Sequence, residues 1–260
     1  MFFRTPPTAG NGFILYSKST SVAVIIFSGG LDSTTLLWYL AKVEGHRKIY
    51  ALTFNYGQKH VKEIEHAKEI VKFARKSLDI NLEHRIVDIT SIKELISTGA
   101  LMGEAEVPKT HYADESQRIT IVPNRNMILL SIAVGYAVKI GARAVYYSAH
   151  RGDYANYPDC RKEFVKAMDT AVYLANIFNP VEIKAPFIDM DKANILKLGL
   201  KLGVPYELTW TCYEGLDRPC LSCGACIERT EAFLLNDVKD PLLSDEEWEK
   251  AVEIYKKVKR

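Results

Sequence analysis

The amino-acid sequence predicts an α/β fold with a doubly wound, mostly parallel sheet, followed by a small C-terminal helical region. Short β-branched runs alternate with helix-type segments along residues 22–202, a pattern typical of strands joined by crossover helices. The 260 residues, 48% of them hydrophobic, suffice for one large core. We therefore expect a loose extension over residues 1–20, an α/β domain over 21–208, and a separate region over 209–260.

Each strand is predicted from a run rich in branched or aromatic side chains; the runs are 22–27, 48–54, 82–89, 143–149 and 181–187. Helices are predicted between and after these strands, at 36–41, 59–78, 92–96, 127–141, 161–175, 192–202 and 227–235. Asn124 suits the N-cap of the fourth of these helices, which is apolar on nearly every face and should be buried. Ser244 and Glu247 form a capping box that starts a last helix.

Residues 98–118 are too long for a simple connection. Loops of this length are usually functional or disordered. Two aromatic residues, His111 and Tyr112, favour a lid or a substrate-contacting segment, and a merely flexible loop is the alternative.

A phosphate-binding loop is predicted where the first strand meets its helix. Two glycines let the backbone approach a ligand, hydroxyl groups add donors, and the helix N-terminus attracts anions. The sequence is neither GxxxxGK[ST] nor GxGxxG, and an ordinary turn with Asp32 as a helix cap is the alternative. The predicted nucleotide-binding residues are Ser28, Gly29, Gly30, Leu31, Asp32, Ser33 and Thr34.

Polar residues follow the ends of several predicted strands. In a parallel sheet these ends meet at one edge, where ligands bind. The loop, Asn55–Gln58, His150–Tyr154 and Asp189–Lys192 should therefore share one cleft.

Four of the five cysteines, Cys212, Cys220, Cys223 and Cys226, fall within fifteen residues. Four thiolates match the closed tetrahedral shell of a structural Zn²⁺. An iron–sulfur cluster is the second interpretation, although the usual trailing spacing and proline are missing. Buried thiols without a metal are the third.

The composition bears on which partners and which cellular location we expect. The formal net charge of +2 gives no reason to expect direct binding of nucleic acid. The longest apolar stretch, 127–138, is too short to span a bilayer, so we expect a cytoplasmic protein. The apolar helix that contains this stretch allows a homodimer.

The stretch Ser28–Ser33, SGGLDS, resembles the signature of the PP-loop ATP pyrophosphatases, which cleave ATP to AMP and pyrophosphate. Within that superfamily, the chain is similar to the 7-cyano-7-deazaguanine synthase family. The resemblance extends from about residue 21 to 235 and is carried by Asn55–Gln58, Val122–Asn126, Tyr157–Arg161 and Trp210–Cys212 with the later cysteines.

The resemblance implies that ATP activates the carboxylate of 7-carboxy-7-deazaguanine, that ammonia attacks it, and that a second activation dehydrates the amide to the nitrile. Residues of this chain suit that chemistry: Asp32 is the candidate to hold Mg²⁺ or its waters, and Ser33 and Lys192 are candidates for phosphate contacts. Arg125 and Arg161 would bind the substrate carboxylate or a phosphate in bidentate fashion. Asp159 would accept hydrogen bonds from the ring edge. Surface salt bridges are the alternative for the two arginines and Asp159, and a solvated side chain is the alternative for Lys192.

Rival functions come from two classes. A PP-loop enzyme that transfers sulfur to tRNA would need persulfide or iron–sulfur cysteines and an RNA-binding surface. A zinc-stabilised module without catalysis would bind ATP but make no AMP. A glutamine-dependent synthetase agrees less well with the sequence, because the residues Met1-Phe2-Phe3 offer no catalytic cysteine.

Overall fold

The computed structural model describes residues 22–259, so the expected extension over residues 1–20 lies outside the described range. One five-stranded sheet forms the centre of the molecule, in the order β3-β2-β1-β4-β5. Every neighbouring pair is parallel, which confirms the predicted α/β class. The strands are β1 (Val22–Ile26), β2 (Lys48–Asn55), β3 (Asn81–Asp88), β4 (Ala144–Tyr146) and β5 (Glu182–Lys184).

Eight helices lie close to the predicted segments: α1 (Leu31–Lys42), α2 (Lys62–Ser77), α3 (Lys93–Ile96), α5 (Arg125–Ile140), α6 (Lys162–Ala175), α7 (Lys192–Leu202), α8 (Gly224–Leu234) and α9 (Asp245–Val258). A further short helix, α4 (Gly99–Met102), was not predicted. Single 3₁₀ turns cover Thr90–Ile92, Glu115–Thr120, Arg151–Ala155, Pro158–Cys160 and Tyr206–Leu208. The capping box of Ser244 and Glu247 at the start of α9 is confirmed.

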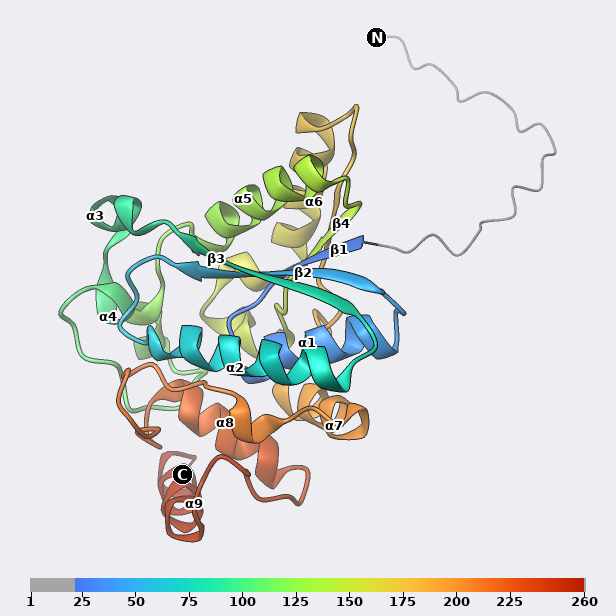
Figure 1. Cartoon of the computed structure of the whole chain (residues 1–260). Coiled ribbons are helices and arrows are strands. Elements are labelled where there is room, and N and C mark those ends of the chain that lie inside the picture. The colour runs from blue at the N-terminus through green and yellow to red at the C-terminus, as the bar shows by residue number, and fades with distance from the viewer. Residues whose placement is uncertain (1–21, 260) are drawn as a thin grey trace.

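Two cores lie on opposite faces of the sheet (Figure 1). Successive side chains of a strand point to opposite faces, so Ala23 and Ile25 of β1 enter one core while Val24 enters the other. Helices α1, α2, α7 and α8 cover the first face, and α5 and α6 cover the second. This is the doubly wound arrangement that the alternating sequence pattern predicts.

Helix α5 is less buried than its composition predicts. It packs Leu129, Leu130 and Ala133 against the sheet, whereas Met127 is 40% exposed. Asn124 holds the N-cap position as expected, but its backbone is left-handed, with φ of 59°, and its side chain makes no capping hydrogen bond. The cap was predicted from residue type alone, and the conformation of the preceding turn overrides it.

The segment 98–118 is not a structureless loop. It contains α4 and enters the 3₁₀ turn Glu115–Thr120. Ala100 and Val107 pack against Cys212 and Cys223. Among the described residues, none from this segment lines the cleft discussed below, but Tyr112 lies close enough to Glu228 and Lys192 of the cleft for both to affect its pKa. A lid or substrate-contacting role for the segment therefore stays a prediction.

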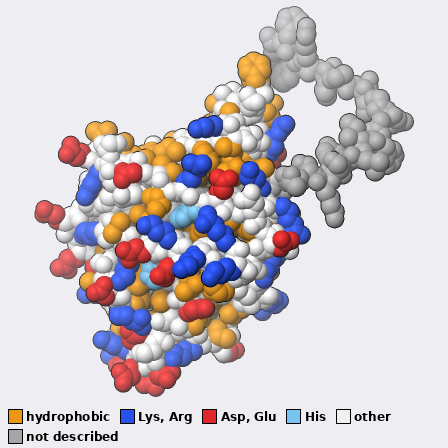
Figure 2. Space-filling model, viewed as in Figure 1, with side chains coloured by type: hydrophobic (Ala, Val, Ile, Leu, Met, Phe, Trp, Pro, Cys, Tyr) orange, Lys and Arg blue, Asp and Glu red, His pale blue; other side chains and the backbone are white. Residues whose placement is uncertain are grey.

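The outer surface carries both signs of charge. Figure 2 shows Lys and Arg interspersed with Asp and Glu on one face, in keeping with the formal net charge of +2. Among residues 22–259, no helix has the length and hydropathy needed to cross a bilayer.

Candidate functional site

A cleft opens at the carboxyl ends of the central strands. The strand order reverses between β1 and β4, and open α/β sheets bind ligands at such a switch point. The loop after β1, the segment after β4, and the N-terminus of α7 all line this cleft, as do Trp210 and Thr211. The convergence predicted from the strand ends is therefore observed for these segments.

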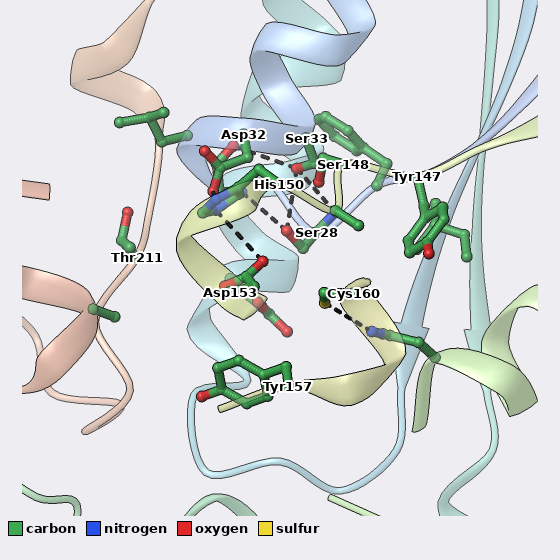
Figure 3. A pocket seen from close by; sticks show the side chains of 18 of the residues that line it. Ser28, Asp32, Ser33, Tyr147, Ser148, His150, Asp153, Tyr157, Cys160 and Thr211 are labelled. Atoms are coloured by element: carbon green, nitrogen blue, oxygen red, sulfur yellow. Dashed lines mark hydrogen bonds and ion pairs between the residues drawn. The ribbon is translucent and has the colours of Figure 1, made fainter. Parts of the chain in front are cut away.

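The loop after β1 leaves the N-terminus of α1 uncapped. Gly30 is the N-cap, and no side-chain capping hydrogen bond to the first turn is found within residues 22–259. The loop is held from within instead, because Ser28 Oγ lies 3.1 Å from Ser33 Oγ and accepts from the Gly30 N–H at 3.2 Å. Figure 3 shows both serines beside Asp32. Free N–H groups at a helix N-terminus can bind a phosphate.

Gly29 has a packing role in this loop. Its φ is +80°, and a Cβ here would lie 2.7 Å from the backbone nitrogen of Ala67 in α2. Its carbonyl accepts from the Trp210 N–H at 3.0 Å. Gly29 therefore lets α2 and the chain near Trp210 approach the loop closely.

Gly29→Ala should lower the free energy of unfolding by about 3 kcal/mol, because a strained φ adds to a backbone clash. Gly45→Ala is the matched control, since Gly45 has φ of +74° and no atom lies within 4 Å of the position that its Cβ would take. It should cost only about 1–2 kcal/mol. Equal losses in urea titrations of the two variants would show that the contact with α2 contributes nothing.

A cluster of buried charges adjoins the loop. Lys192 Nζ lies 3.4 Å from Asp32 Oδ2 and forms an ion pair with Glu228 Oε2. His150 Nε2 lies 3.6 Å from Asp32 Oδ2 and 3.5 Å from Asp153 Oδ2 (Figure 3). The Gly152 N–H lies 3.1 Å from His150 Nδ1, and Nε2 faces the two carboxylates. Burial would lower the pKa of His150, but Asp153 and Asp32 raise it to about 9.

These neighbours fix the charges of Asp32 and Lys192. Burial alone would raise the pKa of Asp32, but Lys192 and His150 outweigh burial and hold it well below its usual range. Burial would lower the pKa of Lys192, but Asp32 and Glu228 raise it. Both groups therefore stay ionised. Asp32 lies in the first turn and does not cap α1, so the alternative of a simple cap is wrong.

Another part of the cleft lining places the guanidinium of Arg125 among aromatic rings. Arg125, at the start of α5, lies among the phenol groups of Tyr56, Tyr157 and Tyr213. Within residues 22–259, no carboxylate oxygen comes within 4 Å of its guanidinium nitrogens as an ion pair. The Asp159 carboxylate is near enough to raise the pKa of Arg125 without forming an ion pair with it among the described residues, so the guanidinium can still bind an anionic group of a ligand.

The four clustered cysteines converge at the start of α8. Their Sγ atoms all lie within 4.8 Å of one another, and Cys220 Sγ is 3.9 Å from Cys226 Sγ. A tetrahedral shell with Zn–S bonds of about 2.3 Å has edges of about 3.8 Å. The Cys220 and Cys223 N–H groups each donate to a cluster sulfur at 3.3 Å. The donor set and its spacing therefore fit a tetrahedral metal ion.

The family model for the queuosine biosynthesis protein QueC matches residues 22–237. This chain belongs to the QueC family. It is 67% identical to the 7-cyano-7-deazaguanine synthase of Archaeoglobus fulgidus over 91% of this chain and 96% of that protein. The synthase of Marinobacter nauticus is 51% identical over 86% and 97%. A 4-thiouridine synthetase–RNA complex with bound ATP aligns over 92% of this chain and 53% of that one, at 18% identity and a TM-score of 0.49.

The sequence-predicted residues of this QueC protein fall into two groups. Ser28, Gly30, Leu31, Asp32, Ser33, Lys192 and Arg125 line the cleft. Gly29 and Thr34 belong to the loop but do not line the cleft in the described chain, and Thr34 is fully buried.

Asp159 and Arg161 lie outside the lining, within the part of the chain that the structure describes. Asp159 Oδ2 accepts from the Asn126 N–H at 3.3 Å, and exposed Arg161 donates to the Tyr154 carbonyl oxygen at 2.9 Å. Arg125 thus lines the cleft of the described chain, whereas Asp159 and Arg161 do not.

Among the residues of the QueC cleft that were not predicted as candidates from the sequence are His60, Glu63 and Glu228, whereas Asp153 lies in the predicted segment His150–Tyr154. Glu228 stands two residues after Cys226, in a segment that the cysteines mark as structural. His60 and Glu63 follow the Asn55–Gln58 motif by a few residues. Helical spacing could have indicated them, because His60 and Glu63 each stand four positions before an apolar residue of the α2 core face, Ile64 and Ala67.

Proposed function

We propose that this protein converts 7-carboxy-7-deazaguanine, ammonia and ATP into 7-cyano-7-deazaguanine, in the biosynthesis of queuosine or archaeosine. Membership of the QueC family carries this proposal. The cleft supports it, because an uncapped helix N-terminus and Lys192 suit phosphate while Arg125 suits a carboxylate on the facing wall.

The chemistry needs two activations of one carbon. A carboxylate oxygen attacks the α-phosphorus of ATP and pyrophosphate leaves; ammonia then displaces AMP and gives the amide. The amide oxygen is activated in the same way, and loss of AMP with two protons leaves the nitrile. Each step develops negative charge on phosphate oxygens, which the first-turn N–H groups of α1 and the ammonium of Lys192 stabilise.

Arg125 has a different task in this scheme. Its guanidinium holds the substrate carboxylate in the cleft and leaves one oxygen free to attack. The phenol groups around it keep water from the activated ester, which would otherwise hydrolyse.

We assign a Mg²⁺ ion to Asp32. Its Oδ1 is buried and has no hydrogen-bond partner among the described residues, so one carboxylate oxygen is available to a cation or to its water. When bound, Mg²⁺ neutralises charge on the triphosphate.

We assign a Zn²⁺ ion to Cys212, Cys220, Cys223 and Cys226, on the sulfur spacing given above. Four thiolates leave no open coordination position, so this metal is structural and takes no part in the reaction. It orders the chain from Trp210 to Arg229, whose core cluster around the cysteines is small.

Several further expectations belong to the same proposal. The α/β unit of 21–208 and the metal-binding unit of 209–260 act together, since residues from both line the cleft. We place the protein in the cytoplasm, with small-molecule substrates and without direct binding of nucleic acid. A homodimer stays a prediction from the apolar composition of α5.

Incubation with 7-carboxy-7-deazaguanine, ATP, Mg²⁺ and ammonium tests the function. Mass spectrometry should find the nitrile, with AMP and pyrophosphate as co-products. Ser28→Ala combined with Asp32→Asn should lower turnover at saturating ATP by at least about 100-fold. Wild-type turnover in that variant would remove the phosphate-loop assignment. ATP binding without any AMP would favour the non-catalytic module, and iron with sulfide in the protein would favour sulfur transfer.

A further inference from the structure

Two buried polar side chains in the cleft have no part in the chemistry above. His60, just before α2, is 5% exposed, and the side chain of Glu63 is 14% exposed. Both line the cleft. The Glu63 carbonyl oxygen lies 3.0 Å from the position that a Cβ on Gly29 would take. Glu63 therefore belongs to the turn of α2 that packs against the phosphate-binding loop, and His60 lies just before that turn.

Hydrogen bonds fix the orientation of this pair. Gln58 Oε1 accepts from the Tyr56 N–H at 3.0 Å, so its amide NH₂ must point the other way. That NH₂ donates to Glu63 Oε1 at 2.8 Å and to the Phe54 carbonyl oxygen at 3.1 Å. His60 Nε2 lies 3.5 Å from the same Glu63 oxygen. We assign the His60 ring proton to Nε2, which faces that oxygen, so that Nδ1 is an acceptor.

Two acceptor atoms remain open to a ligand. His60 Nδ1 is buried with no hydrogen-bond partner in residues 22–259, and no described group donates to Glu63 Oε2. Burial and the nearby Arg125 lower the pKa of His60 to about 3, so the ring stays neutral. An unpaired buried acceptor costs free energy unless a ligand donor satisfies it.

We propose that His60 Nδ1 and Glu63 bind the donor edge of the substrate ring, namely the N1–H and the 2-amino group of the deazaguanine. This inference rests on the proposed function. The ring presents adjacent N–H donors on the edge away from its carboxylate, and the cleft presents two open acceptors, His60 Nδ1 and Glu63 Oε2. Tyr213, whose ring centroid is 5.4 Å from that of His60, offers an aromatic face for the same ring.

The role expected for Asp159 moves to Glu63 under this assignment. Asp159 already accepts from the Asn126 N–H and does not line the cleft in the described chain. Glu63 has the same chemistry with an open oxygen inside the cleft. It is a specificity-determining residue, because it touches the part of the substrate that does not react.

Binding of two ligands tests the assignment: 7-carboxy-7-deazaguanine and its analogue without the 2-amino group. The wild-type protein should bind the parent compound about 10- to 100-fold more tightly, because the analogue leaves a buried acceptor unpaired. In Glu63→Gln the side-chain oxygen still accepts from the Gln58 NH₂, but an amide NH₂ takes the place of the second carboxylate oxygen and faces the ligand. It should weaken the parent about 10- to 100-fold and the analogue about threefold or less. Glu65→Gln, exposed on the same helix, is the matched control and should change neither.

The pH dependence of binding gives a second readout. Burial raises the pKa of Glu63 to about 7, against the lowering effects of Gln58 and Arg125. The charged or titratable groups that face Glu63 are Arg125, His60 and Tyr56, and burial raises the pKa of Tyr56 to about 12. Of Glu63 and these three neighbours, only Glu63 has a pKa near neutrality, so affinity for the parent should fall as the pH drops through about 7. Glu63→Gln should remove this dependence.

The outcomes separate the two proposals. If the wild-type protein binds neither compound, the proposed function fails. If it makes the nitrile but binds both compounds equally, only the assignment of His60 and Glu63 is overturned. Calorimetry on the wild-type protein decides this point even where a Glu63 variant does not fold.

Discussion

Lys192→Met is expected to lower turnover by about 10³-fold while the protein still binds 7-carboxy-7-deazaguanine. Removing one positioned donor from a site where charge develops typically costs 10²–10³-fold in rate, and Lys192 is a buried full charge beside the phosphate-binding loop. Methionine keeps the aliphatic stem and removes only the ammonium. Single-turnover formation of AMP at saturating ATP measures the effect.

The same substitution leaves Asp32 and Glu228 without their shared cation, so a loss of stability must be separated from a loss of catalysis. Breaking a buried pair costs about 3–5 kcal/mol. The double variant Lys192→Met with Glu228→Gln removes one unpaired charge and should regain part of this stability without regaining turnover. Lys197→Met, exposed on the same helix, is the control. Near wild-type turnover in Lys192→Met would exclude phosphate stabilisation by Lys192.

Cys223→Ser is expected to abolish stoichiometric metal binding and to lower the free energy of unfolding by about 3 kcal/mol or more. Cys223 is fully buried and is the N-cap of α8, so its loss removes both a ligand and the fixed start of that helix. For a chain of this size the change corresponds to a fall in Tm of about 6–12 °C.

Elemental analysis and thermal unfolding check the result. Wild-type protein should contain about one zinc per chain. Cys160→Ser changes the one cysteine outside the cluster and should keep the full metal content. A metal-free wild-type preparation with unchanged Tm would remove the structural role of the metal, whereas iron and inorganic sulfide in place of zinc would revive the sulfur-transfer alternative.

Local sequence signals predicted those features that lie within one stretch of chain. The β-branched run into Ser28-Gly29-Gly30 defines strand, turn and helix by itself, and the cysteine spacing brings four sulfurs together over a few turns. The sheet followed because alternating strands and helices admit few topologies. Arg125 was found through a motif at the start of its helix.

Pairings between distant segments escaped prediction. Glu228 forms an ion pair with Lys192, which lies 36 positions away in the sequence. His60 lies near enough to Arg125 for that cation to lower its pKa. The sequence around these residues gives no sign of either interaction. Arg161 illustrates the converse error: its motif is polar and aromatic, yet the turn Pro158–Cys160 directs it outward to the Tyr154 carbonyl oxygen. A charged residue in a motif loop can serve the loop itself.

Helix α8 contacts both the cysteine cluster and the charged cluster of the cleft. Cys226 and Glu228 are two residues apart on it, a rotation of about 200°, so opposite sides of one helix contact the sulfur cluster and the cation Lys192. In the proposed holoenzyme α8 therefore contacts the metal directly and is linked to the nucleotide site through the Glu228–Lys192 ion pair. Thermodynamic linkage makes the effect mutual: whatever free energy the metal contributes to fixing α8 favours the phosphate-binding arrangement, and a bound nucleotide retains the metal more tightly by the same amount.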